Sequence, residues 1–315
     1  IPTPPTTHTS NPVAMATDGT YLWVTVDATP NDLIIKLDPT NTSSPLVTSF
    51  GIGGSAAAPG KEVEGIALHG GALYVVTNDV VTFEQCDQFG CFTDQKSLPI
   101  IHELDMDTGE DQENSVEIRV AGQFGGFTLT DPIGGLASDG DNLYAGTQGG
   151  GQTGIEGAWF AIDPENGNAQ QINEFEGSLP RMSGFEAFEI TTGPQFPENR
   201  QLIGSGDVGN NGNDEADTIA RFNREDGAMF GENTNSGQFV LTGKDIKGLA
   251  YQTSTKTLFL ADNASNKIYG TKLPENTGIE LTTVGNYSAE LAADIGSSTL
   301  VSPTTADYSI VRNDN

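Results

Sequence analysis

An internal repeat constrains the fold of this chain more than any other feature of its sequence. In one copy, the segments Ile246–Tyr251 (IKGLAY), Leu258–Asp262 (LFLAD) and Lys267–Gly270 (KIYG) follow one another with polar residues between them. Short apolar segments separated by turn residues are typical of β-strands. Segments like the first of these recur four times earlier in the chain, at Pro12–Ala16, Val63–Leu68, Ile133–Ala137 and Ser183–Phe188.

A sixth copy is weaker and shares only its spacing with the others. Leu291, Leu300 and Ile310 repeat the intervals between apolar residues in the fifth copy. Four short strands per copy and six copies predict an all-β fold, a six-bladed β-propeller of four-stranded antiparallel blades. A single domain is expected over residues 1–315, with blades at about 11–60, 61–130, 131–181, 182–244, 245–287, and 288–315 together with 1–10.

The two ends of the chain are expected to close this ring. The last copy ends after its third strand, Tyr308–Arg312, and therefore lacks a fourth. The N-terminal segment Thr6–Thr9 is rich in β-branched residues, so we expect it to supply the missing strand. The alternative is a proline-rich linker outside the ring.

The chain is strongly acidic, with 43 Asp and Glu against 14 Lys and Arg and a formal net charge of −29. Such a surface repels phosphate groups, which excludes nucleic acid and anionic membranes as partners. No apolar run is long enough for a membrane-spanning helix, so no membrane insertion is expected. Calcium, protein partners and neutral glycans remain compatible with this charge, and the oligomeric state is left open.

The chain has two cysteines, Cys86 and Cys91, separated by a polar segment that contains a glycine. No histidine lies near them in the sequence, which excludes a zinc site. Their closeness favours a small disulfide, with two free thiols as the alternative. A disulfide predicts an exported protein at an extracellular, cell-surface or periplasmic location. The start, which has neither Met nor a leader pattern, is expected for a processed mature chain or an excised fragment.

Long connections are expected on one face of the propeller. The second copy carries Asn78–Pro99 and the third carries Gly149–Gly154, and both are expected to be irregular loops. The fourth copy carries Asp207–Asp217, in which carboxylates, amides and glycines are closely spaced as calcium requires. The candidate ligands are Asp207, Asn210, Asn211, Asp214 and Asp217, and the alternative for this segment is a solvated acidic turn.

A second acidic segment, which begins at Asp105, also looks like a calcium loop. Asp105, however, occupies the repeat position held by Asp38 and Asp163. At such a position an aspartate starts a turn by accepting hydrogen bonds from the backbone that follows it. We therefore interpret Asp105 as structural.

The start of each innermost strand is expected to point toward the central channel. Glu64, Glu186 and Lys247 are the charged residues at this position, and charges near a closed axis must be paired or bind a metal. A salt bridge between Glu186 and Lys247 is one interpretation. The other is a metal or substrate site that uses Glu64 and Glu186, with Lys247 as a third candidate catalytic residue. The aligned residues are Val13, Glu64, Gly134, Glu186, Lys247 and Ala289.

The opening strands carry a family resemblance. Glu64–Val76 and Gly184–Ala187 resemble secreted phytase-like or esterase-like propellers. Gly248–Tyr251 and Leu258–Asp262 are similar, more distantly, to the gluconolactonase and paraoxonase superfamily. For the lactonase group, the resemblance implies a calcium at the channel mouth, held by Glu, Asn and Asp from different blades, with Glu64 or Glu186 as the Glu ligand.

The absence of serine-hydrolase and zinc-protease sequence motifs favours a binding module over an enzyme. The leading hypothesis is an exported, noncatalytic propeller that binds a protein or glycan through its loop-rich face, is stabilised by calcium and belongs to a larger surface protein. One alternative is a calcium-dependent hydrolase of a lactone, ester or phosphoester, with its site at the channel mouth. Another is a structural module of an extracellular assembly.

Overall fold

The computed structural model describes the parts of the chain that form five β-sheets. The described residues are 11–27, 32–41, 46–51, 63–87, 90–112, 114–120, 127–147, 158–173, 181–189, 200–207, 216–223, 238–242, 245–252, 254–255, 257–263, 267–272 and 286–288.

Four of the sheets contain four strands each, in sequential antiparallel order. The first sheet comprises β1 (Asn11–Thr17), β2 (Leu22–Asp27), β3 (Leu33–Leu37) and β4 (Leu46–Gly51). The second comprises β5 (Val63–His69), β6 (Ala72–Asp87), β7 (Gly90–Leu104) and β8 (Val116–Glu117). The fourth comprises β15 (Arg181–Glu189), β16 (Arg200–Asp207), β17 (Ala216–Asn223) and β18 (Gln238–Thr242). The fifth comprises β19 (Ile246–Gln252), β20 (Thr257–Asp262), β21 (Lys267–Lys272) and β22 (Asn286–Ser288).

The third sheet has two additional strands at its outer edge. Its four antiparallel strands are β11 (Ile133–Ser138), β12 (Leu143–Thr147), β13 (Trp159–Ile162) and β14 (Asn168–Asn173). Beyond β14 lie β9 (Arg119–Val120), which pairs with it in parallel, and β10 (Phe127–Thr128). The connection between the second and third sheets therefore extends the third sheet.

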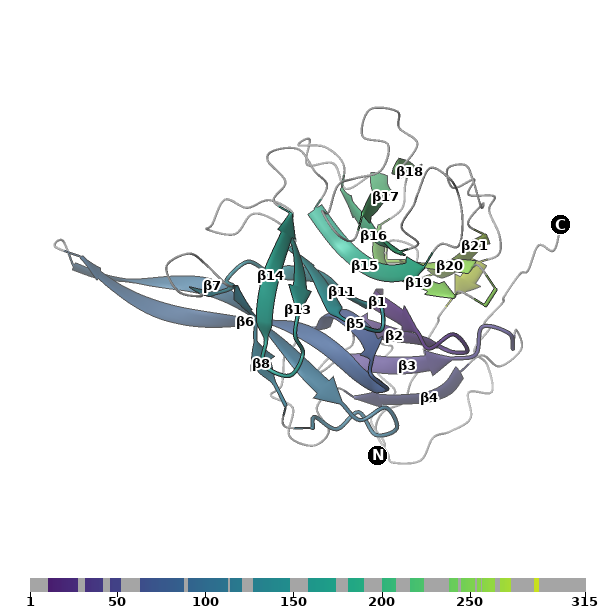
Figure 1. The fold of residues 1–315 in the computed structure, drawn as a ribbon, viewed down its shortest axis with the longest axis horizontal. Helices are drawn as coiled ribbons and strands as arrows, with labels where there is room; N and C mark the ends of the chain where they lie inside the picture. Colours follow the sequence, from purple (N-terminus) through teal and green to yellow (C-terminus); the bar gives the residue numbers. More distant parts are fainter. Residues whose placement is uncertain are drawn as a thin grey trace, which may run out of the picture.

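The sheets are arranged around a common axis, which confirms the β-propeller fold (Figure 1). Their innermost strands contact one another in the cyclic order β1, β5, β11, β15, β19 and back to β1. No helix is found among the described residues, so this part of the chain contains none that could span a membrane.

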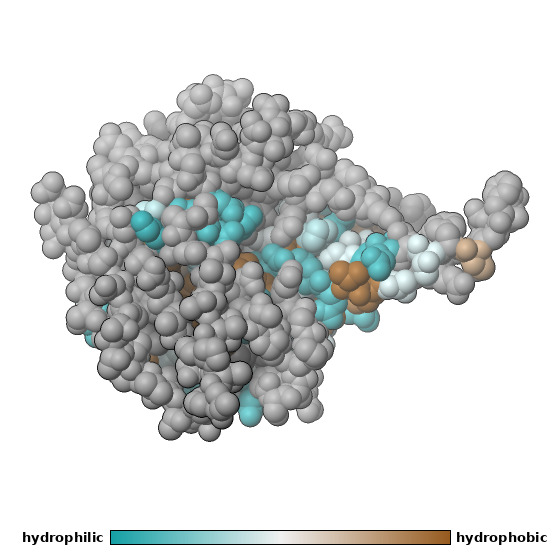
Figure 2. All heavy atoms as spheres, turned by 180° about the vertical axis from the view of Figure 1, so that it is seen from behind, coloured by the Kyte–Doolittle hydropathy of each residue, from teal (hydrophilic) through white to brown (hydrophobic). Residues whose placement is uncertain are grey.

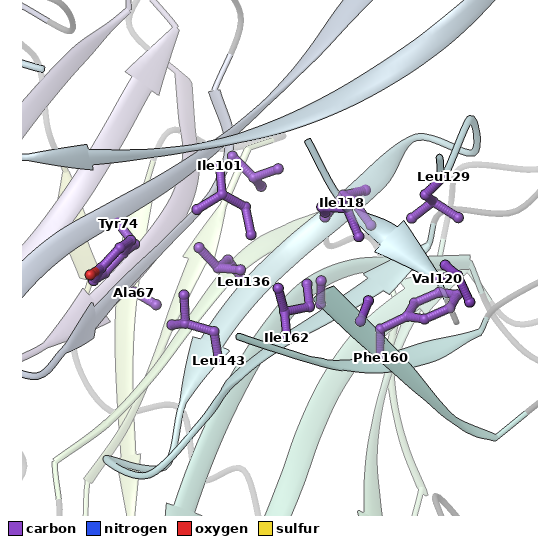
Figure 3. Packing of buried hydrophobic residues seen from close by; sticks show 14 of the residues in the cluster. Ala67, Tyr74, Ile101, Ile118, Val120, Leu129, Leu136, Leu143, Phe160 and Ile162 are labelled. Atoms are coloured by element: carbon purple, nitrogen blue, oxygen red, sulfur yellow. The ribbon is translucent and has the colours of Figure 1, made fainter. Parts of the chain in front are cut away.

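The hydrophobic core lies between neighbouring sheets. Trp23 and Ile34 of the first sheet pack with Val75 of the second. The second and third sheets share the largest described cluster, which includes Ile101 and Phe160 (Figure 3). Full burial of one such side chain contributes about 1.5–3 kcal/mol, so these layers hold the sheets together.

The first and fifth sheets also pack directly on each other. Val24 of β2 belongs to the same buried cluster as Phe259 of β20. At the adjoining turns, the side-chain amide of Gln252 donates a 2.8 Å hydrogen bond to the carbonyl of Gly19. The five described sheets therefore form a closed ring.

The predicted sixth blade is not confirmed. Ser288 ends β22 of the fifth sheet. The other residues assigned to that blade, 289–315 and 1–10, lie outside the described residues, as does the predicted closing strand Thr6–Thr9. The contact between β1 and β19 differs from the prediction, which placed a blade between the first and fifth copies.

A glycine in two of the innermost strands, β5 and β19, allows each of them to approach the next strand closely. A Cβ atom on Gly65 would lie 2.6 Å from the backbone nitrogen of Leu136 in the next sheet. A Cβ atom on Gly248 would lie 2.8 Å from the backbone nitrogen of Met15. Real Cβ atoms do not approach backbone this closely, so the glycine of the repeated motif is required by packing between blades.

We predict that Gly248→Ala destabilises the protein by about 1–3 kcal/mol, because the methyl group would push β19 away from β1. Gly270→Ala is the matched control, since its Cβ would meet only side-chain atoms at 3.4 Å or more. That control is expected to be neutral or stabilising by up to about 1 kcal/mol. Urea unfolding of both variants makes the comparison, and equal effects would contradict this explanation of the motif.

Candidate binding face

Each innermost strand contains a β-bulge near its start. In β5, for example, the register shifts between Val63 and Gly65, which leaves Glu64 as the extra residue. A bulge bends its strand and changes the direction of the extra side chain. The structure thus marks one equivalent position in every described sheet. The residues at this position are Val13, Glu64, Gly134, Ser183 and Lys247.

This register corrects the predicted alignment of Glu186. In β15 the bulge lies between Met182 and Gly184, and Glu186 pairs with Ile203 further along the strand. Glu186 therefore occupies the position that Ala250 holds in β19, where Ala250 pairs with Phe259. The alignment matched a glutamate with a glutamate, whereas the close approach between strands requires the glycine after the bulge to be matched.

Glu64 is consequently the single carboxylate among the five bulged residues. The side chain of Glu186 lies outside the described residues, so its predicted salt bridge with Lys247 stays a prediction. Ala289, the sixth aligned residue, also lies outside them. Glu64 and Lys247 are both half-buried. Glu64 and Glu186 therefore occupy different register positions, and the use of either glutamate by a hydrolase stays a prediction.

Lys247 lies in a polar cluster within the fifth sheet. Its Nζ atom is 3.1 Å from Oδ1 of Asp245, which directly precedes β19. The amide of Asn263 donates to Oδ2 of the same carboxylate at 2.9 Å, and the buried Asp262 accepts the backbone N–H of Asp245 at 3.1 Å. The charge of Lys247 is therefore balanced locally.

Other polar side chains at this end of the ring hold neighbouring sheets together. Asp32 is buried, and its Oδ2 atom accepts the backbone N–H of Val63 at 2.6 Å. Asn78 donates to the carbonyl of Ile133 at 2.8 Å and accepts its N–H at 2.9 Å. These bonds satisfy the backbone where β5 and β11 begin, so Asp32 and Asn78 have architectural roles.

A long β-hairpin arm projects from this face (Figure 1). The second-copy segment Asn78–Pro99, predicted to be irregular, instead continues the pairing of β6 with β7, and the register runs without a break from Asn78 opposite Pro99 to Asp87 opposite Gly90. The segment folds this way because it combines β-branched and aromatic residues with a glycine near its tip. We call the paired residues 78–87 and 90–99 the arm.

Several described side chains of the arm are exposed. Val80 is 69% exposed, and Thr82 and Gln95 are exposed as well. Figure 2 shows apolar and polar residues side by side where the arm leaves the body. Among the described residues, β5 pairs with β6 only as far as Thr77, and no described strand continues the sheet beside the arm. Within the described part of the chain, no further strand covers the edges of the arm, and uncovered strand edges can pair with another extended segment.

The arm brings the two cysteines into opposing positions. Cys86 and Cys91 are direct partners in the antiparallel register. The structure contains no free cysteine among the described residues. Direct partners in an antiparallel pair have Cα atoms about 4.5–5.5 Å apart, which is within the range that a disulfide spans.

The predicted calcium segment begins and ends on the same face. Asp207 ends β16 and is the register partner of Asp217 in β17. Asn210, Asn211 and Asp214 lie outside the described residues. Within the described part of the chain, no group of three or more His, Cys, Asp or Glu residues is arranged to hold a metal. Calcium binding therefore stays a prediction.

The opposite face carries the aspartate turns, and the structural interpretation of Asp105 is confirmed. Oδ1 of Asp105 accepts the backbone N–H groups of Asp107 and Thr108 at 2.9 and 2.8 Å. Oδ1 of Asp38 accepts both the hydroxyl and the N–H of Thr40. These bonds stabilise the charged carboxylates and lower the pKa values of Asp38 and Asp105.

A cavity of about 640 Å³ lies on this opposite face, between the second and third sheets, and was not predicted from the sequence. Nearby, burial raises the pKa of Tyr74, and the negative charges of Glu103 and Glu165 raise it further. The cavity is open and acidic. Its polar lining includes His69, Asp141, Asn142, Asp163, Glu165 and Gln170.

No family model matches the chain, and no curated protein matches it significantly. Solved structures with a similar architecture include a nidogen–laminin complex, at 13% identity and a TM-score of 0.43, covering 83% of this chain and 75% of that one. A putative 6-phosphogluconolactonase from Bacteroides fragilis has 14% identity, a TM-score of 0.39, and coverage of 89% and 94%.

A glutaminyl cyclase from Myxococcus xanthus is similar at 14% identity and a TM-score of 0.36. The match covers 67% of this chain and 65% of the cyclase. These similarities assign neither a family nor an activity, and the propeller assignment rests on the ring of sheets itself.

Proposed function

We propose that this protein is a noncatalytic binding module that contacts a protein partner through the face from which the arm projects. The observation that carries the proposal is the arm itself. A two-stranded ribbon without a third strand is only marginally stable in water. A ribbon that has no third strand among the described residues and carries an exposed Val80 is therefore suited to pairing with another polypeptide.

Charge indicates the class of partner. The chain carries a net charge of −29, which disfavours association with a second copy of itself. The arm contains four acidic residues and one lysine, Asp79, Glu84, Asp87, Asp94 and Lys96. A basic protein surface that offers an extended edge complements both features.

A disulfide between Cys86 and Cys91 is part of this proposal. It would join the two strands near the tip of the arm and reduce the number of conformations available to the free ribbon. Disulfides persist in oxidising compartments, so this part of the proposal also places the protein outside the cytosol, at an extracellular, cell-surface or periplasmic location.

The proposal is tested by removing the arm. Residues 80–97 are replaced by Asn-Gly, a two-residue turn that joins the register partners Asp79 and Leu98. The full chain and the armless variant are applied to an array of purified basic extracellular proteins. We expect saturable binding of the full chain to a subset of them and at least about a tenfold loss without the arm, which is about 1.4 kcal/mol.

The controls of this experiment distinguish strand pairing by the arm from binding through net charge alone and from misfolding of the armless variant. The armless variant must keep the melting temperature of the full chain. Equal binding by both proteins would contradict the role of the arm, as would binding that follows only the net charge of the array proteins. Thiol labelling before and after reduction reports the proposed disulfide in the same sample.

Calcium at Asp207–Asp217 is a separate proposal about stability. It is supported by the oxygen-rich composition of the segment and by its position between two paired strands. Calcium at 100 times its dissociation constant would stabilise the folded chain by about 2.7 kcal/mol. We expect calcium to raise the melting temperature of the natural chain but not that of the Asp207→Ala, Asp214→Ala, Asp217→Ala variant. An unchanged melting temperature of the natural chain would contradict the proposal.

A further inference from the structure

His102 lies at the base of the arm, in a position that neither the repeat nor the proposed function explains. It is a buried residue of β7 and the register partner of Val75 in β6. Val75 and Leu104 belong to the cluster between the first and second sheets, which places His102 on the side of the second sheet that faces the first. The arm begins one residue after Thr77, which contacts the histidine ring.

Both ring nitrogens of His102 have hydrogen-bond partners. Nε2 is 3.1 Å from the hydroxyl oxygen of Thr77. Nδ1 is 3.0 Å from Oδ2 of Asp111 and 2.7 Å from the hydroxyl oxygen of Ser115. The two hydroxyls are themselves bonded to carboxylates, Thr77 to Asp79 and Ser115 to Asp111, each at 3.1 Å.

The two neutral tautomers and the doubly protonated form of the His102 ring differ in which of these hydrogen bonds they can make. In a neutral ring with the proton on Nε2, the lone pair of Nδ1 would face the carboxylate of Asp111. In a neutral ring with the proton on Nδ1, the single hydroxyl proton of Thr77 would have to serve both Nε2 and Asp79. In the doubly protonated ring, Nε2–H donates to Thr77, Thr77 donates to Asp79, and Nδ1–H donates toward Asp111 and Ser115.

The charges on the elements around the ring are mainly negative. The acidic groups there include, besides Asp111, Asp32 of the first sheet, Asp79 of β6, Glu103 of β7, Glu110 of the connection and Glu117 of β8. The cations are Lys36, whose Nζ lies over the rings of Tyr21 and Trp23, and Arg119, which pairs with Glu117 at 3.7 Å. Two carboxylates are therefore linked to the ring, Asp111 directly and Asp79 through Thr77.

We propose that His102 is a proton-dependent clamp that, as an imidazolium, ties the base of the arm to the connection between β7 and β8. Thr77 and Asp79 belong to β6, the ring belongs to β7, and Asp111 and Ser115 belong to the connection. When the imidazolium loses one proton, at least one hydrogen bond in this series is broken. The base of the arm is then held less firmly. The clamp acts within the chain and needs no partner.

The direction of the pH dependence follows from linkage. A histidine whose charged form is favoured in the folded chain titrates above its ordinary value of about 6.5. Its contribution to stability is complete below that value and is lost as the pH rises through the higher, folded-state midpoint. The arm is therefore expected to be held most firmly in mildly acidic solution.

The test is a nitrogen-detected NMR titration of the three histidines, His8, His69 and His102, assigned with single glutamine substitutions. We expect both ring nitrogens of His102 to be protonated at pH 6.5 and its midpoint to lie above about 6.5. Amide exchange between Asp79 and Leu98, corrected for intrinsic rates, should accelerate about tenfold as the pH passes that midpoint.

Asp111→Asn should lower the midpoint of His102 and reduce the pH dependence of the arm. Glu110→Gln is the matched control, since it removes one neighbouring charge without touching the ring. It should leave the midpoint of His102 and the pH dependence of amide exchange in the arm nearly unchanged. A neutral ring at pH 6.5, a midpoint at or below about 6.5, or equal shifts in the two variants would overturn the proposal. The titration of the natural chain decides the first two outcomes even if a variant fails to fold.

Discussion

The close packing of the innermost strands is the constraint on which the rest of the structure depends. Each described innermost strand contacts the next one around the ring, and a glycine after the bulge leaves room for the neighbouring backbone at Gly65 and Gly248. A larger residue at either position would separate two sheets and open the apolar clusters between them. The short motif repeated along the chain is therefore primarily a packing motif.

The same packing determines which residues reach the binding face. Because each described innermost strand has a bulge near its start, one residue of each strand is set apart there, and the connections between second and third strands lie beside it. The arm and the Asp207–Asp217 segment both leave the ring there. Among the described residues, this face thus gathers a long hairpin, both ends of an acidic connection and one bulged carboxylate, Glu64.

The sequence was sufficient to predict the opening strands and the aspartate turns, because these depend on local pattern. The alternation of apolar residues located the opening strands, and the position of Asp105 within the repeat identified it as a turn residue. Glu186 was misplaced because its identity was compared with Glu64, while the register depends on the small residue at Gly184.

Features that arise from contacts across the sheets were not predicted. The segment Asn78–Pro99 was expected to be irregular because it is long and polar, yet its residues pair in register along its whole length. The surroundings of His102 combine residues from three segments, and no local pattern relates Thr77 to Asp111. The six-blade prediction relied on the weakest copy, whose residues lie outside the described chain.

Direct contact between the first and fifth sheets is the central claim, and a distance measurement across it is the most direct test. Spin labels at Thr20→Cys and Ser254→Cys, in a Cys86→Ser, Cys91→Ser background, would sit on the adjoining turns that Gly19 and Gln252 join. The five-sheet ring predicts strong dipolar broadening between the labels. An intervening sixth blade would add about 10 Å to their separation, and the absence of broadening would contradict the account.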